Sequence, residues 1–336
     1  WFETIQSHEG KAAGYDADCM LFGAEAYTTV RWIGNENGYA HDNTWSKSQV
    51  DKSANTINSN SQGSYTVGLE NGNQWTVPEA DARITSGWFW GTAKNTPKTI
   101  SALAEMYFRS VGHNATFLLN VPPNNVGSVD QAILDRVTEF GKNVRQTFAN
   151  NLVQTASADS VRGNDLAYKP GNTIDGQDDT YWTTSDGTNT GTLLLDLGGV
   201  QSFDVVSIEE VIQFGQRINQ YRVEYRDAAG QWHELASGQT IGGKRLCRTG
   251  VVKGDQVRIT VTVPEGKVPM LSEVGVYKAS KGFQLPGAAP EGMDVLDISN
   301  SAFSFGSGWT DETGSQFIGG TNKWANSGAK FTTTFT

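Results

Sequence analysis

The segment Thr116-Phe-Leu-Leu-Asn-Val121 predicts a buried strand that lies between two helices. In the sequence before it, Thr99 or Ser101 can cap a helix, and Gly112 ends that helix. The apolar residues of this first helix fall on one face and are Ile100, Leu103, Ala104, Tyr107 and Val111. A second helix pattern follows the strand, and this alternation of strand and helix implies a parallel sheet.

The second helix is predicted from its start signal and its apolar stripe. Pro122-Pro123 ends the preceding strand, and Ser128 with Gln131 forms a capping box. The stripe consists of Val129, Ile133, Val137, Phe140, Val144 and Phe148. Two more strands are expected nearby: a buried one at Cys19–Ala24, and a short aromatic one at Trp88–Trp90 in which alternation would bury at least two rings.

Glu36 lies in a loop that follows Val30-Arg-Trp32 and leads into Asn37-Gly38. A carboxyl group beside an aromatic face can have its pKa raised enough to donate a proton at neutral pH. A nearby arginine, here Arg31, can hold an anion or a sugar hydroxyl. Glu36 is therefore a candidate general acid. The pattern also suits an ordinary turn with a solvated glutamate, because Asn-Gly is a common turn pair.

The composition favours a β-rich protein that handles carbohydrate. Ten Trp and ten Tyr occur among 336 residues, of which only 18% are charged. Such rings can stack on the C–H faces of sugars, or they can simply fill sandwich cores. The formal net charge of −10 argues against nucleic acid and anionic membrane surfaces as partners. No run is long enough to cross a membrane, and Cys19 and Cys247 are expected to be buried free thiols.

After residue 150 the strand patterns come without helices. They lie at residues 193–197, 205–208, 221–226, 257–263 and 274–277. This pattern predicts an antiparallel sandwich over residues 151–279, after an α/β domain at residues 1–150. Residues 280–336 are predicted to be a linker followed by an incomplete β-rich segment. Both ends of the chain are expected to be cut from a longer protein.

Four segments resemble the second half of the catalytic barrel in family 29 glycoside hydrolases, the α-L-fucosidases. They are Arg31-Trp-Ile-Gly-Asn-Glu-Asn-Gly38, Trp75-Thr-Val-Pro-Glu-Ala-Asp81, Gly87-Trp-Phe-Trp90 and Leu118-Leu-Asn-Val-Pro-Pro123. Their order and spacing resemble the subgroup that acts on α-1,3/1,4-linked fucose in branched, Lewis-type glycans. The resemblance covers roughly the first domain. It implies a multidomain α/β and all-β protein that begins with the C-terminal half of a (β/α)-barrel.

The resemblance implies a retaining mechanism, in which one carboxylate attacks the anomeric carbon and a second carboxyl group protonates the leaving oxygen and then activates water. Glu36 matches the acid/base of this subgroup. The family's nucleophile is an Asp at a strand end of the Trp-x-Asp-Gly type, which the chain lacks. That Asp and the histidines that bind fucose hydroxyls are therefore expected upstream of Trp1.

The same resemblance suggests a set of substrate-binding side chains. The methyl group and C–H face of fucose need aromatic walls, and the hydroxyls of neighbouring sugars suit carboxylates. The candidates are Arg31, Trp32, Glu79, Asp81, Trp88 and Trp90. For Glu79 a solvated loop position is an equal alternative. The implied partners are fucosylated oligosaccharides or glycoproteins, and the implied location is extracellular or on the cell surface.

The sandwich resembles the factor 5/8 type C domain, a galactose-binding-like jelly roll also known as a family 32 carbohydrate-binding module. The resemblance is carried by residues 172–182, 195–198, 221–232 and 271–277. Such domains often hold a structural calcium ion, for which Asp175, Asp178, Thr180 and Glu273 are the candidate ligands. The alternative is a turn in which Asp175 caps backbone N–H groups without a metal. Catalysis is expected to need no cofactor.

Three hypotheses follow for the function. The first is a fragment of an α-1,3/1,4-L-fucosidase with Glu36 as general acid/base. The second is a non-catalytic carbohydrate-binding fragment of such an enzyme, whose sandwich could bind sugar through Phe214, Arg217 and His233. The third is a different retaining glycosidase on the same scaffold, in which Glu36 keeps its role.

Overall fold

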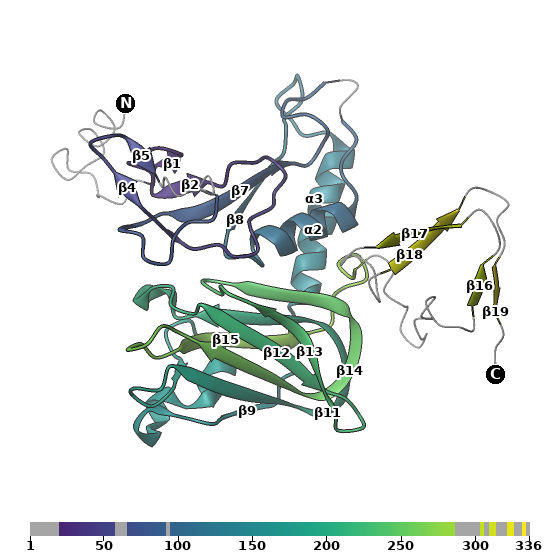
Figure 1. Cartoon of the computed structure of the whole chain (residues 1–336). Coiled ribbons are helices and arrows are strands. Elements are labelled where there is room, and N and C mark those ends of the chain that lie inside the picture. The colour runs from purple at the N-terminus through teal and green to yellow at the C-terminus, as the bar shows by residue number, and fades with distance from the viewer. Residues whose placement is uncertain are drawn as a thin grey trace.

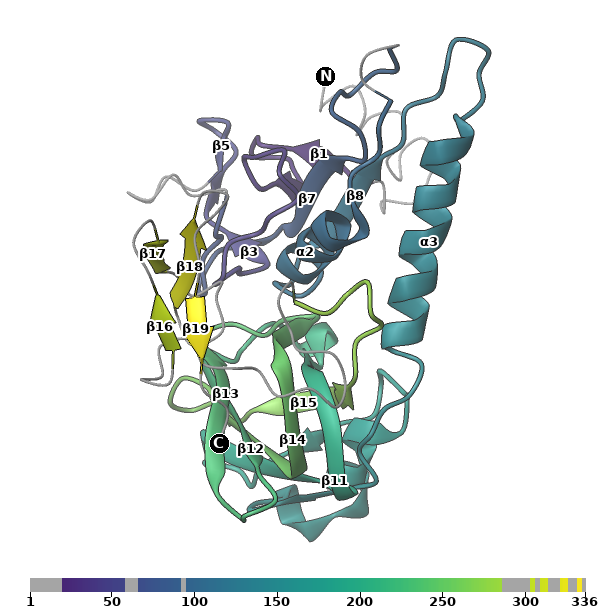
Figure 2. The same cartoon turned by 90° about the vertical axis from the view of Figure 1, so that its right-hand side faces the viewer.

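The computed structural model describes residues 20–57, 66–91 and 95–285 in full, and the backbone of four short strands beyond residue 300. Figure 1 shows an α/β part above a β-sandwich. In the view of Figure 2, helix α3 (Gln131–Thr147) runs along the side of the α/β part down to the sandwich. Cys19 and the segments before it lie outside the described residues.

A four-stranded parallel sheet forms the centre of the first part. Its strands are β1 (Phe22–Gly23), β2 (Val30–Trp32), β7 (Val77–Arg83) and β8 (Thr116–Asn120), in that order across the sheet. Every pair of neighbours is parallel. The chain connects β7 to β8 through helix α2 (Ile100–Ser110) and continues from β8 into α3. The predicted parallel sheet and both helices are confirmed.

The helix starts differ in how well the sequence predicted them. Thr99 caps α2, because its hydroxyl accepts a hydrogen bond from the Ala102 N–H at 3.2 Å. The capping box predicted at Ser128 and Gln131 is wrong. The N-cap of α3 is Asp130, and its side chain makes no cap hydrogen bond. Its carboxylate instead accepts hydrogen bonds from Trp90, Asn95 and Asn124.

Two predicted strands also need correction. The strand predicted at Cys19–Ala24 spans only Phe22–Gly23 among the described residues, and Phe22 is 52% exposed because it lies at the edge of the sheet. Trp88–Trp90 forms bends instead of a strand, and Phe89 is 86% exposed. None of the three rings is buried, because the two indole N–H groups hydrogen-bond to carboxylates near the surface.

Arg31 is a buried structural residue and not an exposed substrate-binding one. It is 0% exposed, and its guanidinium donates to the carbonyl oxygens of Thr76 at 2.7 Å and Trp45 at 2.6 Å. These bonds attach the long β2–β7 connection to the sheet. That connection carries two small antiparallel pairs, β3 (Lys47–Ser48) with β6 (Gln74–Trp75) and β4 (Val50–Asp51) with β5 (Thr56–Ile57).

The second part is an antiparallel sandwich, as predicted. Its strands are β9 (Thr155–Ala158), β10 (Trp182–Thr183), β11 (Thr190–Glu210), β12 (Gln220–Arg226), β13 (Trp232–Gly238), β14 (Arg245–Thr262) and β15 (Met270–Tyr277). The first half of β11 pairs with β9 and its second half with β15. Irregular pairing between Asp196 and Val205 separates the halves, so one long strand contributes to both layers.

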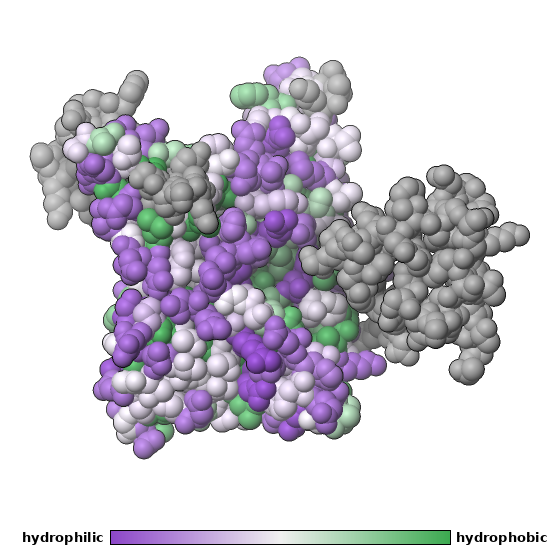
Figure 3. Space-filling view, in the orientation of Figure 1, coloured by the Kyte–Doolittle hydropathy of each residue, from purple (hydrophilic) through white to green (hydrophobic). Residues whose placement is uncertain are grey.

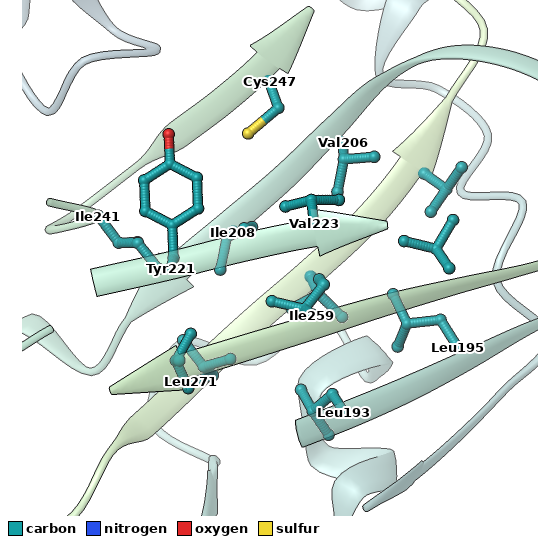
Figure 4. Close-up of a cluster of buried hydrophobic side chains, with 14 of the residues drawn as sticks. Leu193, Leu195, Val206, Ile208, Tyr221, Val223, Ile241, Cys247, Ile259 and Leu271 are labelled. Carbon is teal, nitrogen blue, oxygen red and sulfur yellow. The ribbon is translucent and has the colours of Figure 1, made fainter. Parts of the chain in front are cut away.

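The sandwich encloses the larger apolar core. Figure 4 shows side chains from β11, β12, β14 and β15 pointing toward one another, including Leu193, Val206, Val223, Ile259 and Leu271. Cys247 lies in this core as a buried free thiol, which confirms the prediction for Cys247. The outer face of the sandwich that is visible in Figure 3 is mostly hydrophilic, with hydrophobic residues in small separate patches.

The two parts are joined through buried polar contacts. The Asn114 side-chain amide and the Gln216 amide both donate to the Thr44 carbonyl, at 3.1 and 3.0 Å. The Ser46 N–H donates to Gln216 at 2.8 Å, and the Leu246 N–H of β14 donates to the Gly112 carbonyl at 3.0 Å. The bonds of Gln216 and Leu246 cross the junction. Separating the two parts would break them and leave their polar groups without these partners.

The start of the predicted linker packs against the helices. Phe283 is 0% exposed and contacts the rings of Tyr107, Phe108 and Phe140. Beyond it, the described strands form two antiparallel pairs: β16 (Phe303–Phe305) with β19 (Phe331–Thr333), and β17 (Trp309–Thr313) with β18 (Thr321–Ala325). This agrees with the β-rich character expected there.

Arg31→Met should lower the free energy of unfolding by about 2–4 kcal/mol, because it leaves two buried carbonyl groups without a donor. Urea unfolding followed by tryptophan fluorescence measures the loss. Arg145→Met on the surface of α3 is the control and should change stability by less than about 0.5 kcal/mol. Equal stability of the wild type and Arg31→Met would contradict the structural role.

His113 should make stability depend on pH. Burial and the neighbouring Arg245, with a smaller effect of Arg109, lower the pKa of His113 to about 4, and Asp42 opposes them. The unfolded chain binds this proton near pH ~6.5 and the folded chain near pH ~4, so stability is lost as the pH falls through that window. His113→Gln should reduce the loss by on the order of 2 kcal/mol at about pH 4.5.

This difference is measured by urea unfolding of the wild type and the variant at several pH values. Only the difference between the two proteins is interpreted, since other groups titrate in the same range. His41→Gln, at an exposed histidine of the β2–β7 connection, is the control. Parallel pH profiles for wild type and His113→Gln would rule out this role.

Candidate functional site

Strand β7 places polar side chains on one face of the parallel sheet. Pro78, Ala80 and Ala82 are buried, whereas the residues that alternate with them are half-buried. Glu79, Asp81 and Arg83 therefore point to the face opposite the buried alanines. Two carboxylates and a guanidinium thus share one face.

The neighbouring strands continue this polar face. Trp32 of β2 pairs with Glu79, and Asn120 of β8 pairs with Arg83, so their side chains point to the same side of the sheet. The Trp32 indole N–H donates to the Asp81 carboxylate at 2.9 Å. The face is therefore a connected surface of aromatic, acidic and amide groups.

Glu36 lies beside this face, in the loop at the carboxyl end of β2. Its carboxylate accepts a hydrogen bond from the Trp88 indole N–H at 2.8 Å. Trp88 comes from the loop at the carboxyl end of β7, and its carbonyl accepts from the Asn120 side chain at 2.9 Å. The Arg83 guanidinium lies 5.7 Å from the Trp88 ring. Three strand ends thus meet around one carboxylate, at the end of a parallel sheet where active sites form.

Glycine at position 38 lets the Glu36 loop lie directly on β7. Gly38 has φ +72°, and an added Cβ would lie 3.0 Å from the Ala82 Cβ. Its N–H donates to the Asp81 carbonyl at 2.9 Å. A side chain here would be strained both by φ and by this contact. The loop therefore has one fixed position relative to the sheet.

The acidic pair on β7 interacts electrostatically. Partial burial, together with the nearby Asp81 charge, raises the pKa of Glu79 above its ordinary value. Carboxylates crowded in this way are good acceptors for hydroxyl donors, because each hydroxyl hydrogen bond relieves their mutual repulsion.

Not all the predicted site residues come together. Trp32, Glu79, Asp81 and Trp88 lie with Glu36 on this face. Trp90 belongs to a separate cluster, where its indole N–H donates to Asp130 at 2.8 Å. Arg31 lies on the other side of the strand, inside the protein. The substrate-binding prediction for Arg31 is therefore wrong, since no described solvent-facing surface includes its guanidinium.

Two residues of this cluster were not selected from the sequence. Arg83 lies two residues after Asp81 in β7, so the period-two alternation of a strand could have indicated it. Asn120 lies inside the Leu-Leu-Asn-Val-Pro-Pro segment, at the last position of β8. Its role depends on a contact with a loop 32 residues earlier, which spacing does not show.

A hollow of about 390 Å³ lies beside the Glu36 loop. Its lining includes Gly34, Asn35 and Asn37 of that loop, together with Tyr39 and Arg109. Glu36 itself is not part of the lining, because its side chain turns toward Trp88. The loop thus has a hollow on one side and the Trp88 ring on the other.

The predicted calcium ligands gather at one turn of the sandwich. The Thr180 hydroxyl donates to Asp175, whose carboxylate also accepts from the Gln177 N–H at 3.0 Å. Glu273 accepts from the N–H groups of Gly176 and Gln177. Burial raises the pKa of Glu273 to about 7. Among the described residues, no group of three or more His, Cys, Asp or Glu side chains is placed to hold a metal.

Asp175 thus caps the Gln177 N–H of this turn, and the calcium site stays a prediction. Asp178, the fourth predicted ligand, is exposed. The sugar-binding candidates of the sandwich also separate: Phe214 and Arg217 line one cavity, whereas His233 pairs with Asp227 at 2.7 Å elsewhere.

The family model for the F5/8 type C domain matches residues 154–274, which covers the sandwich strands. No helix in the described part of the chain is long and apolar enough to span a membrane.

Known proteins resemble most of the chain. It is 34% identical to alpha-L-fucosidase 1 of Arabidopsis thaliana over 283 residues, which are 82% of this chain and 53% of that protein. A Ruminococcus gnavus GH29 fucosidase, solved in complex with fucose, is 65% identical with a TM-score of 0.81, over 84% of this chain and 57% of that one. The structure of SpGH29 is 32% identical with a TM-score of 0.72, over 83% and 59% of the two chains.

The chain thus spans about half the length of the curated relative it matches. The chain is therefore a homologue of the GH29 α-L-fucosidases, and it carries an F5/8 type C domain at residues 154–274.

Proposed function

We propose that this chain supplies the acid/base part of a retaining α-L-fucosidase, with Glu36 as the general acid/base. The observation that carries the proposal is the Glu36–Trp88 hydrogen bond at the carboxyl ends of β2 and β7. This bond holds the Glu36 carboxylate at the carboxyl end of the parallel sheet, in a chain homologous to GH29 fucosidases. The four parallel strands are proposed to belong to a (β/α)-barrel that the parent protein completes.

In the proposed reaction, the Glu36 carboxyl group donates its proton to the oxygen that links fucose to the rest of the glycan. After the leaving group departs, the Glu36 carboxylate takes a proton from water, and that water releases fucose from the enzyme. The nucleophile is proposed to be an Asp from a preceding barrel strand, about 5–5.5 Å from Glu36 as retaining enzymes require.

The polar face beside Glu36 is proposed to bind the sugars. Indole rings at Trp32 and Trp88 offer apolar surfaces for the C–H face of fucose. Glu79 and Asp81 accept hydrogen bonds from hydroxyl groups, which stabilises two carboxylates that otherwise repel each other. Several acceptors on one face suit a branched glycan, and this supports α-1,3/1,4-linked, Lewis-type substrates on extracellular or cell-surface glycoproteins.

The competing proposal is a non-catalytic carbohydrate-binding fragment. This proposal applies to the chain by itself, because the nucleophile is expected elsewhere in the parent protein. A Lewis-type trisaccharide should therefore release no fucose with this chain alone and should release fucose with the parent. Activity of the isolated chain would show that the nucleophile lies among residues 1–336.

Glu36→Gln in the parent enzyme should lower kcat on natural glycans by about 10²–10⁴-fold, because proton donation to a poor leaving group is lost. Activity on an aryl fucoside with a good leaving group should be largely retained in its first step, measured as the burst of released phenol. The matched control is Glu265→Gln, at an exposed turn of the sandwich. An equal loss on both substrates would argue against proton donation by Glu36.

The prediction of a structural calcium ion at the Asp175 turn can be tested separately. Asp175, Asp178, Thr180 and Glu273 would hold the ion, and it would supply only charge neutralisation at the turn. Because the Asp175 and Glu273 carboxylates already accept N–H and O–H groups, we expect calcium to raise the melting temperature by less than about 2 °C relative to a chelator. A larger shift that Glu273→Gln removes would show that these residues bind calcium.

A further inference from the structure

A cavity of about 510 Å³ opens between one end of the sandwich and the β2–β7 connection. Lys47 of β3 lines it from the α/β part. Loops of the sandwich line the rest, including Arg162, Arg217 and Lys267. Its volume suits a ligand the size of one or two sugar rings. Because Lys47 comes from outside the sandwich, the α/β part contributes one of the four cations of the lining.

The cavity is basic, although the protein as a whole is acidic. Four cationic side chains line it, and Asp186 is the one carboxylate among its described lining residues. Asp186 is already paired with Arg162. The formal charge of the lining is therefore about +3, in a chain of formal net charge −10. Lys47, Arg162 and Arg217 are half-buried and Lys267 is exposed. Cations that line one cavity repel one another, and a bound anion would offset that repulsion.

One aromatic ring, that of Phe214, lines the cavity, and two tyrosine rings support it from behind. Phe214 is 49% exposed and contacts Tyr181 edge-on, with ring centroids 5.8 Å apart. Tyr181 in turn contacts Tyr168 at 5.5 Å. An exposed ring that is supported from behind can stack on the C–H face of a sugar, because it needs no rearrangement to do so.

The segment that carries Phe214 and Arg217 is held in place from inside the protein. Gln216, between them, is 6% exposed and accepts a hydrogen bond from the Ser46 N–H at 2.8 Å. The backbone N–H of Arg217 donates to buried Glu210 at 2.7 Å. The guanidinium of Arg217 donates to the Phe214 carbonyl at 3.0 Å, which ties the charged group to the segment that carries the ring.

From the charge, the ring and the volume of this cavity, we propose that it binds an acidic sugar residue, one that carries a carboxylate or a sulfate group. Lys47, Arg217 and Lys267 would face the anionic group, and Phe214 would cover the ring. The site is separate from the Glu36 cluster, so it does not depend on the proposed fucosidase activity.

The test is isothermal titration calorimetry on the whole chain with glucuronic acid, galactose 6-sulfate, neutral galactose and inorganic sulfate. At least one acidic sugar should bind about tenfold more tightly than galactose and than sulfate alone. Its binding should weaken when NaCl is raised from about 50 to about 500 mM, because salt screens the cations. The better acidic sugar identifies which anionic group the site prefers.

Lys47→Gln and Lys267→Gln should each weaken that binding about two- to fivefold, and Phe214→Ala should weaken it as well. Lys253→Gln is the matched control, since Lys253 lies on β14 away from the cavity lining. The proposal fails if neither acidic sugar binds, if galactose or sulfate alone binds equally well, or if Lys253→Gln has the same effect as the cavity variants. Circular dichroism establishes that each variant is folded.

Discussion

The close contact between Gly38 and Ala82 is the constraint on which the Glu36 site depends. Because position 38 carries no side chain and has a left-handed backbone, the loop after β2 can rest on β7 and bond to the Asp81 carbonyl. Any Cβ at this position would push the loop away from the sheet. Glu36 is two residues from that contact, so its backbone is placed by the loop, and its hydrogen bond with Trp88 then orients the carboxylate.

Buried and half-buried residues alternate along β7, and this alternation sets polar side chains beside Glu36. Alanines at positions 80 and 82 fill the narrow space toward the helices, which leaves the residues between them to face the opposite side. The small residues of β7 are therefore buried on one face, and its larger polar residues lie on the other. The sandwich adds rigidity from below, because Asn114 and Gln216 share the Thr44 carbonyl across the junction.

The sequence predicted the regular elements better than the site. The α2 and α3 patterns, β8 and the sandwich strands are local and periodic, and each was found. The Trp88–Trp90 strand was wrong because side-chain hydrogen bonds to Glu36 and Asp130, both distant in sequence, hold that segment in bends. Arg31 was misassigned for a related reason: in a strand of three residues, pattern alone does not show which side faces the protein interior.

The geometry around Glu36 also bears on how a solvent-exposed carboxyl group could act as an acid. The Trp88 N–H occupies one oxygen of Glu36. In the proposed acid role, the other oxygen would carry the proton toward the leaving group. Trp88 is itself fixed through its carbonyl by Asn120. A flexible glutamate would spend much of its time in unproductive rotamers, and ordering it costs free energy. The neighbouring loops order the Glu36 side chain when the protein folds. In the proposed reaction, substrate binding would therefore not have to supply that ordering.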